Sequence, residues 1–302
     1  MHIVITYLKP KEKVINMKYS FIVALYNAAD YIEETLKSML NQSFDDFEII
    51  LVNDGSVDKS VEVVSKYVDG KKVKLINQNN QGCGGARNTG IKASCGEYIV
   101  IVDADDLVEP DLLENLNTKN TDIIKYKVRC IEEEPNNRFE LTTFNSMSGV
   151  DAVIEFCKTK NIWATPWGSA IKRSLFIDND FFFESRRYHE DFGLIPRMYL
   201  KAETVSSIDY MGYNYIKRPN SITTKTDILT TFKRTRDFMY HFVKNKEYII
   251  ENCSLPINEK DIIVEYFTER FLLKLAKIDE REQNMMIGEV YNEPNNRKIK
   301  TK

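Results

Sequence analysis

Three aspartates stand within four residues, Asp103, Asp105 and Asp106, directly after the apolar run 98–102. Ionised carboxylates ~4 Å apart repel one another by about 4 kcal/mol per pair at an effective dielectric constant of 20, so a positive partner is expected among them. The chain nearby offers Arg87. Hard oxygen ligands also suit Mg²⁺ or Mn²⁺, and an ion with open positions normally shares them with phosphate oxygens. The pattern therefore indicates a metal site that holds a nucleoside diphosphate, and a solvated acidic loop is the alternative.

Two further polar segments carry residues that bind phosphates or nucleobases in other proteins. Asn53, Asp54, Gly55 and Ser56 follow an apolar run, and a glycine-rich stretch, 82–85, precedes Arg87. Taken alone, the first could be a tight turn with a helix cap and the second a loose loop. The glycines are not followed by Lys-Ser/Thr and do not follow the first strand, which excludes a Walker phosphate loop and the dinucleotide fingerprint.

The elements that must position these residues alternate between short apolar runs and helical patterns. This alternation predicts an α/β protein with a mostly parallel central sheet flanked by helices. Ligands bind outside the carboxyl ends of such strands, and the polar segments all follow strands. The expected strands are 19–25, 47–52, 73–76 and 98–102, with helices at 31–40, 61–68, 86–93 and 110–116.

The pattern is weaker after residue 120. It predicts strands at 123–128, 204–208 and 213–217 and helices at 150–157 and 196–202. Two amphipathic helices are expected between 226 and 279, as a C-terminal helical segment whose apolar stripe forms core. The basic tail after residue 288 could contact an anionic membrane surface, although a solvated chain end is the simpler interpretation.

Composition excludes several classes of protein. With 42 Lys and Arg against 45 Asp and Glu, the net charge of -3 gives no general attraction to nucleic acid. Five cysteines without a C-x-x-C pair do not indicate disulfides or structural zinc, and three histidines do not indicate a histidine metal cluster. The apolar runs are far shorter than the ~20 residues that cross a bilayer, so we expect a soluble cytoplasmic protein.

Several motifs, taken together, resemble the family 2 glycosyltransferases of the GT-A fold. They are residues 19–27, the 53–56 turn, Gly-Ala-Arg-Asn at 85–88 and Val-Asp-Ala-Asp-Asp at 102–106. Further on, Trp167-Gly168, His189-Glu190-Asp191 and the segment 215–223 resemble the acceptor half of that family. The resemblance covers residues 17–224, and its order and spacing are highly specific.

The resemblance implies roles for the donor side of the site. Tyr26 and Asp54 would border the nucleobase, with the carboxylate accepting from the uracil imide, and Asn80 and Arg87 would complete that pocket. Asp103 would approach the ribose. Asp105 would bind Mn²⁺ or Mg²⁺ on the diphosphate of a UDP-sugar, with Asp106 in support.

It also implies roles for the acceptor side. Asp191 would be the general base, with Glu190 beside it, and this arrangement implies inversion at the anomeric carbon. An acid in the first turn of a helix is the plain alternative for Asp191. Trp167 and Arg218 could contact the acceptor, although core packing and a surface loop are equally simple readings of these two residues.

The sequence departs from the family pattern at Ala24, where a proline is common, and at Asn53, where a second aspartate is common. The Gln-x-x-Arg-Trp element of processive synthases is absent, so one sugar is expected per binding event. The acceptor would be a hydroxyl of a surface glycan or of a lipid-linked saccharide.

The resemblance also sets expected domain limits. These are an extension over 1–16, a glycosyltransferase domain over 17–225 with halves 17–117 and 118–225, and a C-terminal region over 226–302. Two other functions stay open: a sugar nucleotidyltransferase, whose glycine-rich loop would follow the first strand, and a non-catalytic glycan-binding or assembly protein of the same fold.

Overall fold

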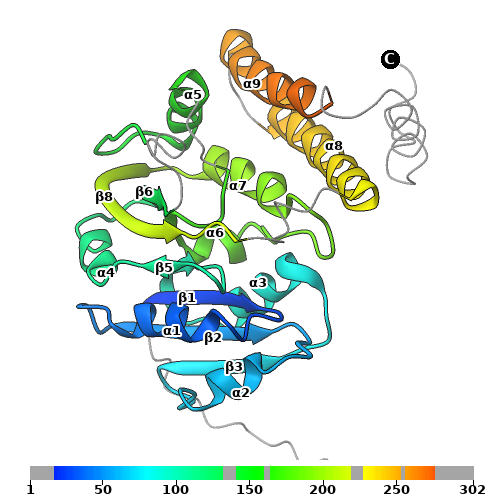
Figure 1. Cartoon of the computed structure of the whole chain (residues 1–302). Coiled ribbons are helices and arrows are strands. Elements are labelled where there is room, and N and C mark those ends of the chain that lie inside the picture. Colours follow the sequence, from blue (N-terminus) through cyan, green and yellow to red (C-terminus); the bar gives the residue numbers. More distant parts are fainter. Residues whose placement is uncertain (1–16, 132–140, 160–163, 219–226, 253–255, 276–302) are drawn as a thin grey trace, which may run out of the picture.

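A computed structural model of the chain describes residues 17–131, 141–159, 164–218, 227–252 and 256–275. The predicted extension over 1–16 and the basic tail lie outside these residues. Within them, one eight-stranded sheet has the order β3-β2-β1-β4-β7-β6-β8-β5 and runs through the molecule (Figure 1).

The first half of the sheet is parallel, as the sequence predicts. Strand β1 (Met17–Leu25) pairs with β2 (Phe47–Asn53) and β4 (Gly96–Ile101), and β2 pairs with β3 (Val73–Asn77). The register places Leu25 beside Asn53 and Asn53 beside Asn77, so these strands end at one edge. The intervening helices are α1 (Ile32–Leu40), α2 (Ser60–Ser65) and α3 (Gly82–Ala93).

The second half of the sheet is mixed. Strand β6 (Ile123–Cys130) is parallel to β8 (Val205–Tyr215), whereas β7 (Ser169–Lys172) joins β4 to β6 with both pairings antiparallel. The two-residue strand β5 (Leu107–Val108) pairs antiparallel with β8. The sequence did not indicate β5 or β7. The strands predicted at 204–208 and 213–217 are one strand, whose register against β6 shifts near Tyr126 and Lys127.

Helices cover the sheet and extend beyond it. They are α4 (Leu112–Leu116), α5 (Gly149–Thr159), α6 (Arg173–Ile177), α7 (Glu190–Lys201), α8 (Ile228–Asn252) and α9 (Ile257–Leu275). The predicted C-terminal pair is confirmed, and in Figure 1 it lies beyond α7, at the end of the molecule away from β3. Ile263 and Phe267 of α9 are buried in the same core as Phe192 of α7.

Alternating side chains of the strands feed two apolar clusters, one on each face of the sheet. In β1, Ile22 belongs to the cluster that contains α5 and α7, while Phe21 and Val23 belong to the cluster that contains α1. No helix in the part of the chain described here is both long and apolar enough to cross a membrane.

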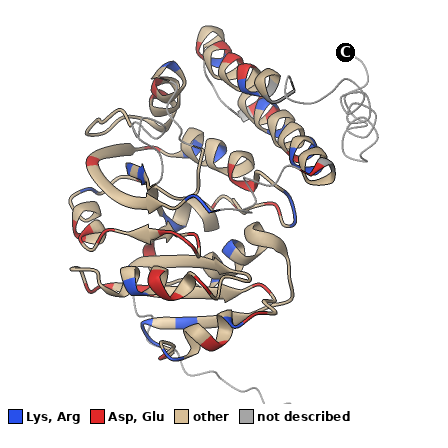
Figure 2. Cartoon of the chain, viewed as in Figure 1, with Lys and Arg blue, Asp and Glu red and all other residues tan. Residues whose placement is uncertain are grey.

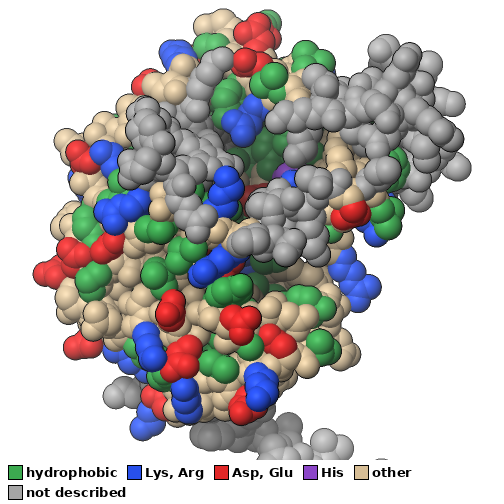
Figure 3. Space-filling view, viewed as in Figure 1, with side chains coloured by type: hydrophobic (Ala, Val, Ile, Leu, Met, Phe, Trp, Pro, Cys, Tyr) green, Lys and Arg blue, Asp and Glu red, His purple; other side chains and the backbone are tan. Residues whose placement is uncertain are grey.

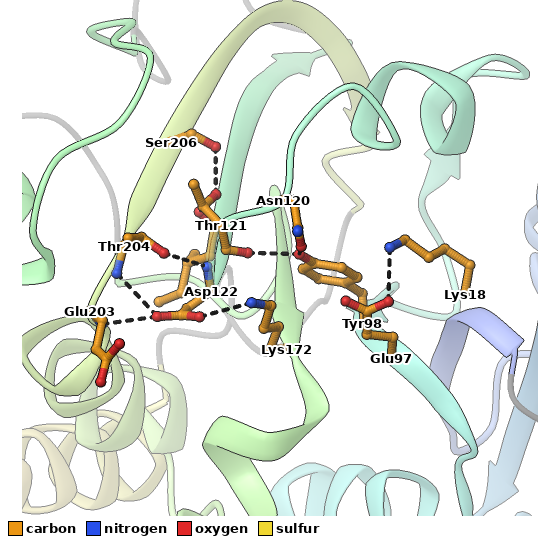
Figure 4. A network of polar contacts seen from close by, with 11 residues as sticks. Lys18, Glu97, Tyr98, Asn120, Thr121, Asp122, Lys172, Glu203, Thr204 and Ser206 are labelled. Carbon is orange, nitrogen blue, oxygen red and sulfur yellow. Dashed lines mark hydrogen bonds and ion pairs between the residues drawn. The ribbon is translucent and has the colours of Figure 1, made fainter.

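A polar network ties strands together at the edge where β6 and β8 begin (Figure 4). The Asp122 carboxylate accepts hydrogen bonds from Lys172 Nζ at 3.1 Å and from the backbone N–H of Thr204 at 3.0 Å. The Tyr98 hydroxyl of β4 donates to the Thr121 carbonyl at 2.8 Å. These contacts fix the register of β4, β6, β7 and β8 and leave the opposite edge of the sheet for the site.

Candidate active site

Two loops meet where β1 and β2 end. Asn27 has a left-handed backbone, with φ of 50°, and its side-chain oxygen accepts from the Val57 N–H at 2.9 Å. The Asn27 N–H in turn donates to the Ser56 hydroxyl at 3.1 Å. Tyr26 follows β1 and is 52% exposed. These hydrogen bonds join the two loops and hold Tyr26 at the surface, where its ring can stack on a ligand.

Asp54 is buried behind these loops and anchors the start of α3. Its carboxylate accepts from the N–H groups of Gln81 and Gly82, both at 2.8 Å, and from Gln78 Nε2 at 2.7 Å. A carboxylate is favourable at a helix N-terminus because it accepts from free N–H groups there. Asn80 Nδ2 donates to the Asp54 carbonyl at 3.0 Å, so the structure brings these two predicted residues together. The contact of Asp54 with a nucleobase stays a prediction.

Arg87 is the positive partner that the aspartates require. Its guanidinium lies in α3 with 5% exposure, donating to Asp103 Oδ1 at 2.8 Å and to Glu190 Oε1 at 2.6 Å. The sequence prediction placed Arg87 beside Asn80 in a base pocket. The observed contacts make it a bridge between the end of β4 and the start of α7, and its part in a base pocket stays a prediction.

Close packing keeps this bridge in place. A Cβ at Gly84 of α3 would lie 2.5 Å from the Glu184 carbonyl oxygen and 3.2 Å from Glu190 Cγ. The guanidinium of Arg87 also lies over the Phe183 ring, 5.5 Å from its centroid. Helix α3 therefore approaches the segment before α7 closely enough for Arg87 to span both.

Asp106 points into the protein and supports the acidic loop from behind. It is 1% exposed and accepts from the Tyr213 hydroxyl at 2.7 Å and from the Ile216 N–H at 2.8 Å. Burial raises the pKa of Asp106 to about 8, with a further contribution from the charge of Asp103. The Tyr213 hydroxyl also accepts from the Asp103 N–H at 3.2 Å. Tyr213 could not be picked out from the sequence, because only the pairing of β8 with β5 brings it to this loop.

Trp167 supports Tyr213 and offers little surface to an acceptor. Its ring stacks on those of Tyr213 and Tyr215, at centroid distances of 5.5 and 5.7 Å, and the residue is 9% exposed. The sequence left two roles open for Trp167, contact with the acceptor and core packing, and these contacts match core packing.

Asp105 is the member of the acidic loop whose carboxylate forms no hydrogen bond or ion pair with another of the described residues, whereas Asp103 pairs with Arg87 and Asp106 accepts from Tyr213. Burial, and then the charge of Asp103, raise its pKa to about 6, while Arg218 lowers it. Arg218 donates to the Asp105 carbonyl at 3.2 Å and lies over the Tyr31 ring, 4.1 Å from its centroid. Arg218 thus lies at the acidic loop, and its contact with an acceptor stays a prediction.

The residues present fit a metal ion that is held partly by the protein and partly by the phosphates of a bound substrate. In the described parts of the chain, no three His, Cys, Asp or Glu side chains converge into a metal-binding group. Mg²⁺ is commonly held by one or two carboxylates together with substrate phosphates and water. Asp105 can supply such a carboxylate, whereas Asp103 and Asp106 already have partners within the protein.

Asp191 lies in the first turn of α7 and is half-buried. Its Oδ1 accepts from the Phe192 N–H at 2.7 Å. Burial, and then the neighbouring charge of Glu190, raise the pKa of Asp191 to about 7. A general base is most effective when its pKa lies near the working pH, so this carboxylate is suited to removing a proton near neutrality.

These groups occupy one polar region between the two halves of the sheet. Arg87 joins Asp103 to Glu190, and Asp191 follows Glu190 directly. Figure 3 shows a hollow in the face in view, where hydrophobic, basic and acidic side chains and a histidine are visible, and Figure 2 shows that Lys and Arg are interspersed with Asp and Glu over the molecule. The arrangement can bind a charged ligand and remove a proton beside it.

Comparison with known proteins gives consistent results. The model of "Glycosyl transferase family 2" matches residues 20–187. The chain is 28% identical over 254 residues to a cholesterol galactosyltransferase of Borreliella burgdorferi, covering 78% of this chain and 70% of that protein. It is 34% identical over 215 residues to the uncharacterized glycosyltransferase EpsJ of Bacillus subtilis, covering 68% of this chain and 62% of EpsJ.

A solved structure has the same fold. Residues 1–349 of S. aureus TarS in complex with UDP superpose with a TM-score of 0.71 at 25% identity, covering 90% of this chain and 78% of that one. The complex of the same protein with UDP-GlcNAc gives a TM-score of 0.73 at 24% identity.

Proposed function

Because this chain belongs to glycosyl transferase family 2 and is a glycosyltransferase of the GT-A fold, we propose that it moves a sugar from a UDP-sugar to an acceptor hydroxyl with inversion and with the help of a divalent metal. The observation that carries the proposal is the link from Asp103 through Arg87 to Glu190 and Asp191. It unites the acidic loop, where a diphosphate would bind, with a carboxylate whose pKa suits a general base.

The donor is proposed to be a UDP-sugar. TarS, which shares the fold, has been solved with UDP and with UDP-GlcNAc. In this chain Tyr26 is exposed at the end of β1 and would stack on the base, and Asp54 and Asn80, which are hydrogen-bonded to each other, would form the wall of the pocket. The carboxylate of Asp54 would accept from the imide N–H of uracil.

Mn²⁺ or Mg²⁺ is proposed to bind at Asp105, and when bound it stabilises the negative charge that develops on the leaving diphosphate. Arg87 holds the Asp103 side chain in place beside this position. Tyr213 and Ile216 hold Asp106, which fixes the backbone of the loop that carries Asp105.

Asp191 is proposed to take the proton of the acceptor hydroxyl. The oxygen then forms a bond to the anomeric carbon as the bond from that carbon to the diphosphate breaks, and UDP leaves with the bonding electrons. Attack opposite the leaving group inverts the anomeric configuration. General base catalysis of this kind typically contributes ~10² to 10⁴ in rate.

The acceptor is proposed to be a hydroxyl of a surface glycan or of a lipid-linked saccharide, with one sugar added per binding event. For a lipid-linked acceptor, the chain would work in the cytoplasm at the inner face of the membrane. Nucleic acid is not expected as a partner, because the near balance of 42 basic and 45 acidic residues provides no general attraction.

The test is a UDP-release assay with a panel of UDP-sugars, with and without Mn²⁺, and with saccharide acceptors. Asp191→Asn is expected to keep UDP affinity and to lose transfer by ~10² to 10⁴. Asp105→Ala is expected to lose the metal-dependent part of UDP binding. Glu62→Gln, at an exposed position in the first turn of α2, is the control that should match the parent protein. Unchanged turnover in Asp191→Asn would contradict the assigned base.

A further inference from the structure

Helix α8 contacts the segment that carries Glu190 and Asp191. This helix lies outside residues 20–187, the part of the chain that the family model matches. It nevertheless packs extensively against α7, and several of its side chains contact residues 184–193. The role of α8 is therefore not explained by the common part of the fold.

Asp237 of α8 holds the chain just before the proposed base. It is 1% exposed, and its carboxylate accepts from Arg187 Nη1 at 3.1 Å and from the Tyr188 backbone N–H at 3.0 Å. The guanidinium of Arg187 also lies over the Tyr240 ring, 3.8 Å from its centroid. One buried carboxylate thus fixes both a side chain and a backbone N–H three residues before Asp191.

His189, between these contacts and Asp191, has a left-handed backbone, with φ of 58°. Non-glycine residues adopt this conformation at a cost and keep it only when their surroundings impose it. The surroundings here again come from α8, because the His189 ring packs edge-on against Phe238, 5.4 Å between centroids. The turn that leads into α7 is therefore held by two successive residues of α8.

A second contact lies just after Asp191. Pro196 has no N–H, so the Phe192 carbonyl lacks its usual partner four residues on in α7. Asn245 of α8 takes that place, with Nδ2 donating to the Phe192 oxygen at 2.7 Å. A Cβ at Gly193 would lie 2.2 Å from His241 Nδ1, so the two helices are in direct contact at this point.

Asp191 consequently lies between two contact points with the same helix. Its own hydrogen bond goes to the Phe192 N–H, within the segment that these contacts fix. We propose that Asp237 is a positioning residue for the transfer reaction, which holds the turn 187–189 and thereby the direction of the Asp191 carboxylate. This inference rests on the proposed function and makes α8 part of the catalytic architecture.

The test compares Asp237→Asn with the parent protein. Arg187 donates to one carboxylate oxygen and the Tyr188 N–H to the other, so an asparagine, whose NH₂ replaces one of these oxygens and cannot accept, loses one of the two bonds. We expect kcat to fall at least tenfold while the KM for the donor changes less than twofold, because the proposed donor residues Tyr26, Asp54 and Asp105 lie in the segments after β1, β2 and β4 and not in the turn that Asp237 holds. Asp237→Glu, which keeps the charge, should recover part of kcat. Glu247→Gln, an exposed position on the same helix, is the matched control.

Asp237 also pairs with its neighbour Arg236, at 2.9 Å, so a double-mutant cycle with Arg187→Gln shows whether the pair with Arg187 carries the effect. If it does, the double variant loses no more kcat than Asp237→Asn alone. Circular dichroism at the assay temperature confirms that each variant is folded. A folded Asp237→Asn protein with the kcat of the parent would overturn the inference, and so would a loss of kcat matched by an equal loss of donor affinity.

Hydrogen exchange separates a failure of this inference from a failure of the proposed function. Amides of residues 187–193 should exchange faster in Asp237→Asn, with those of α3 unchanged, whether or not a sugar donor is found. Unchanged protection of 187–193 would overturn the positioning role by itself. Absence of transfer by the parent protein with every donor would contradict the proposed function instead.

Discussion

Replacing Arg87 by methionine should destabilise the protein by an amount that depends on pH. The change removes a guanidinium that pairs with both Asp103 and Glu190, whose side chains are 30% and 13% exposed. Removing one partner of a buried ion pair costs about 3 to 5 kcal/mol, since the other charge stays buried. Because Asp103 keeps some contact with water, we expect the lower end, about 3 kcal/mol at pH 8.

The dependence on pH follows from the carboxylates that remain. Burial already raises the pKa of Glu190, and Arg87 opposes that shift. Without Arg87 the folded-state pKa of Glu190 rises further above its unfolded value. A group with a raised folded pKa is favourable to the folded state at low pH, and this contribution is lost as pH rises through the folded pKa. The difference between parent and variant should therefore be larger at pH 8 than at pH 5.

Urea denaturation followed by circular dichroism at these two pH values measures the effect. In thermal unfolding, the same loss of about 3 kcal/mol would lower Tm by roughly 6 to 12 °C for a domain of this size. Arg129→Met is the control, because the Arg129 side chain is 48% exposed and lies 3.8 Å from Glu109. Exposed pairs of this kind are worth about 0 to 1 kcal/mol. Equal losses in the two variants, or a larger loss for Arg87→Met at pH 5, would refute the reasoning.

Three further changes test other parts of the structure. If Asp191 is the base, kcat should rise with pH through about 7 and level off above it, and a flat profile from pH 5 to 9 would contradict this. Gly193→Ala places a Cβ 2.2 Å from His241 Nδ1, and overpacking of this kind costs about 1 to 3 kcal/mol, measurable as a lower urea midpoint. Tyr213→Phe removes the hydroxyl that donates to buried Asp106, at a cost of about 1 to 3 kcal/mol; an unchanged midpoint would show that the bond contributes nothing.

The parallel half of the fold could be predicted from the sequence because its central strands are largely buried on both faces. Residues 47–53, for example, are all buried, and the apolar run 49–52 within them can be recognised without knowledge of a partner strand. Strands β5 and β7 have two and four residues, and they exist only through pairing with β8, β4 and β6. No local pattern marks such strands.

The sequence predicts a helix over 196–202, but α7 spans Glu190–Lys201, so the predicted start was wrong. Pro196 favours a helix start near itself, since proline is common in the first turn. The helix begins at Glu190 instead, and Asn245, 53 residues away from Phe192, supplies the hydrogen bond that proline cannot make. A distant side chain thus overrides a local signal that is normally reliable.

The candidate site divides in the same way. Asp54, Asp105 and Asp191 could be picked out because each follows a strand or opens a helix within a recognisable motif. The contact of Arg87 with Glu190, 103 residues away, and the inward turn of Asp106 toward Tyr213, 107 residues away, could not. These contacts depend on how β8 and α7 pack, which spacing along the chain does not encode.

The position of β5 limits how this enzyme could be recombined with its relatives. Leu107 and Val108 fall within residues 17–117, the half predicted to bind the donor, yet they form the outermost strand beside Asn214 and Tyr213 of β8. A chimaera joined at residue 117, with the rest taken from another protein, would therefore present its edge strand to a foreign β8. A chimaera should therefore fold only if β5 and β8 are taken from the same protein. For the same reason, we expect a new acceptor specificity to evolve by substitutions in the segments between β5 and β8 rather than by exchange of whole halves.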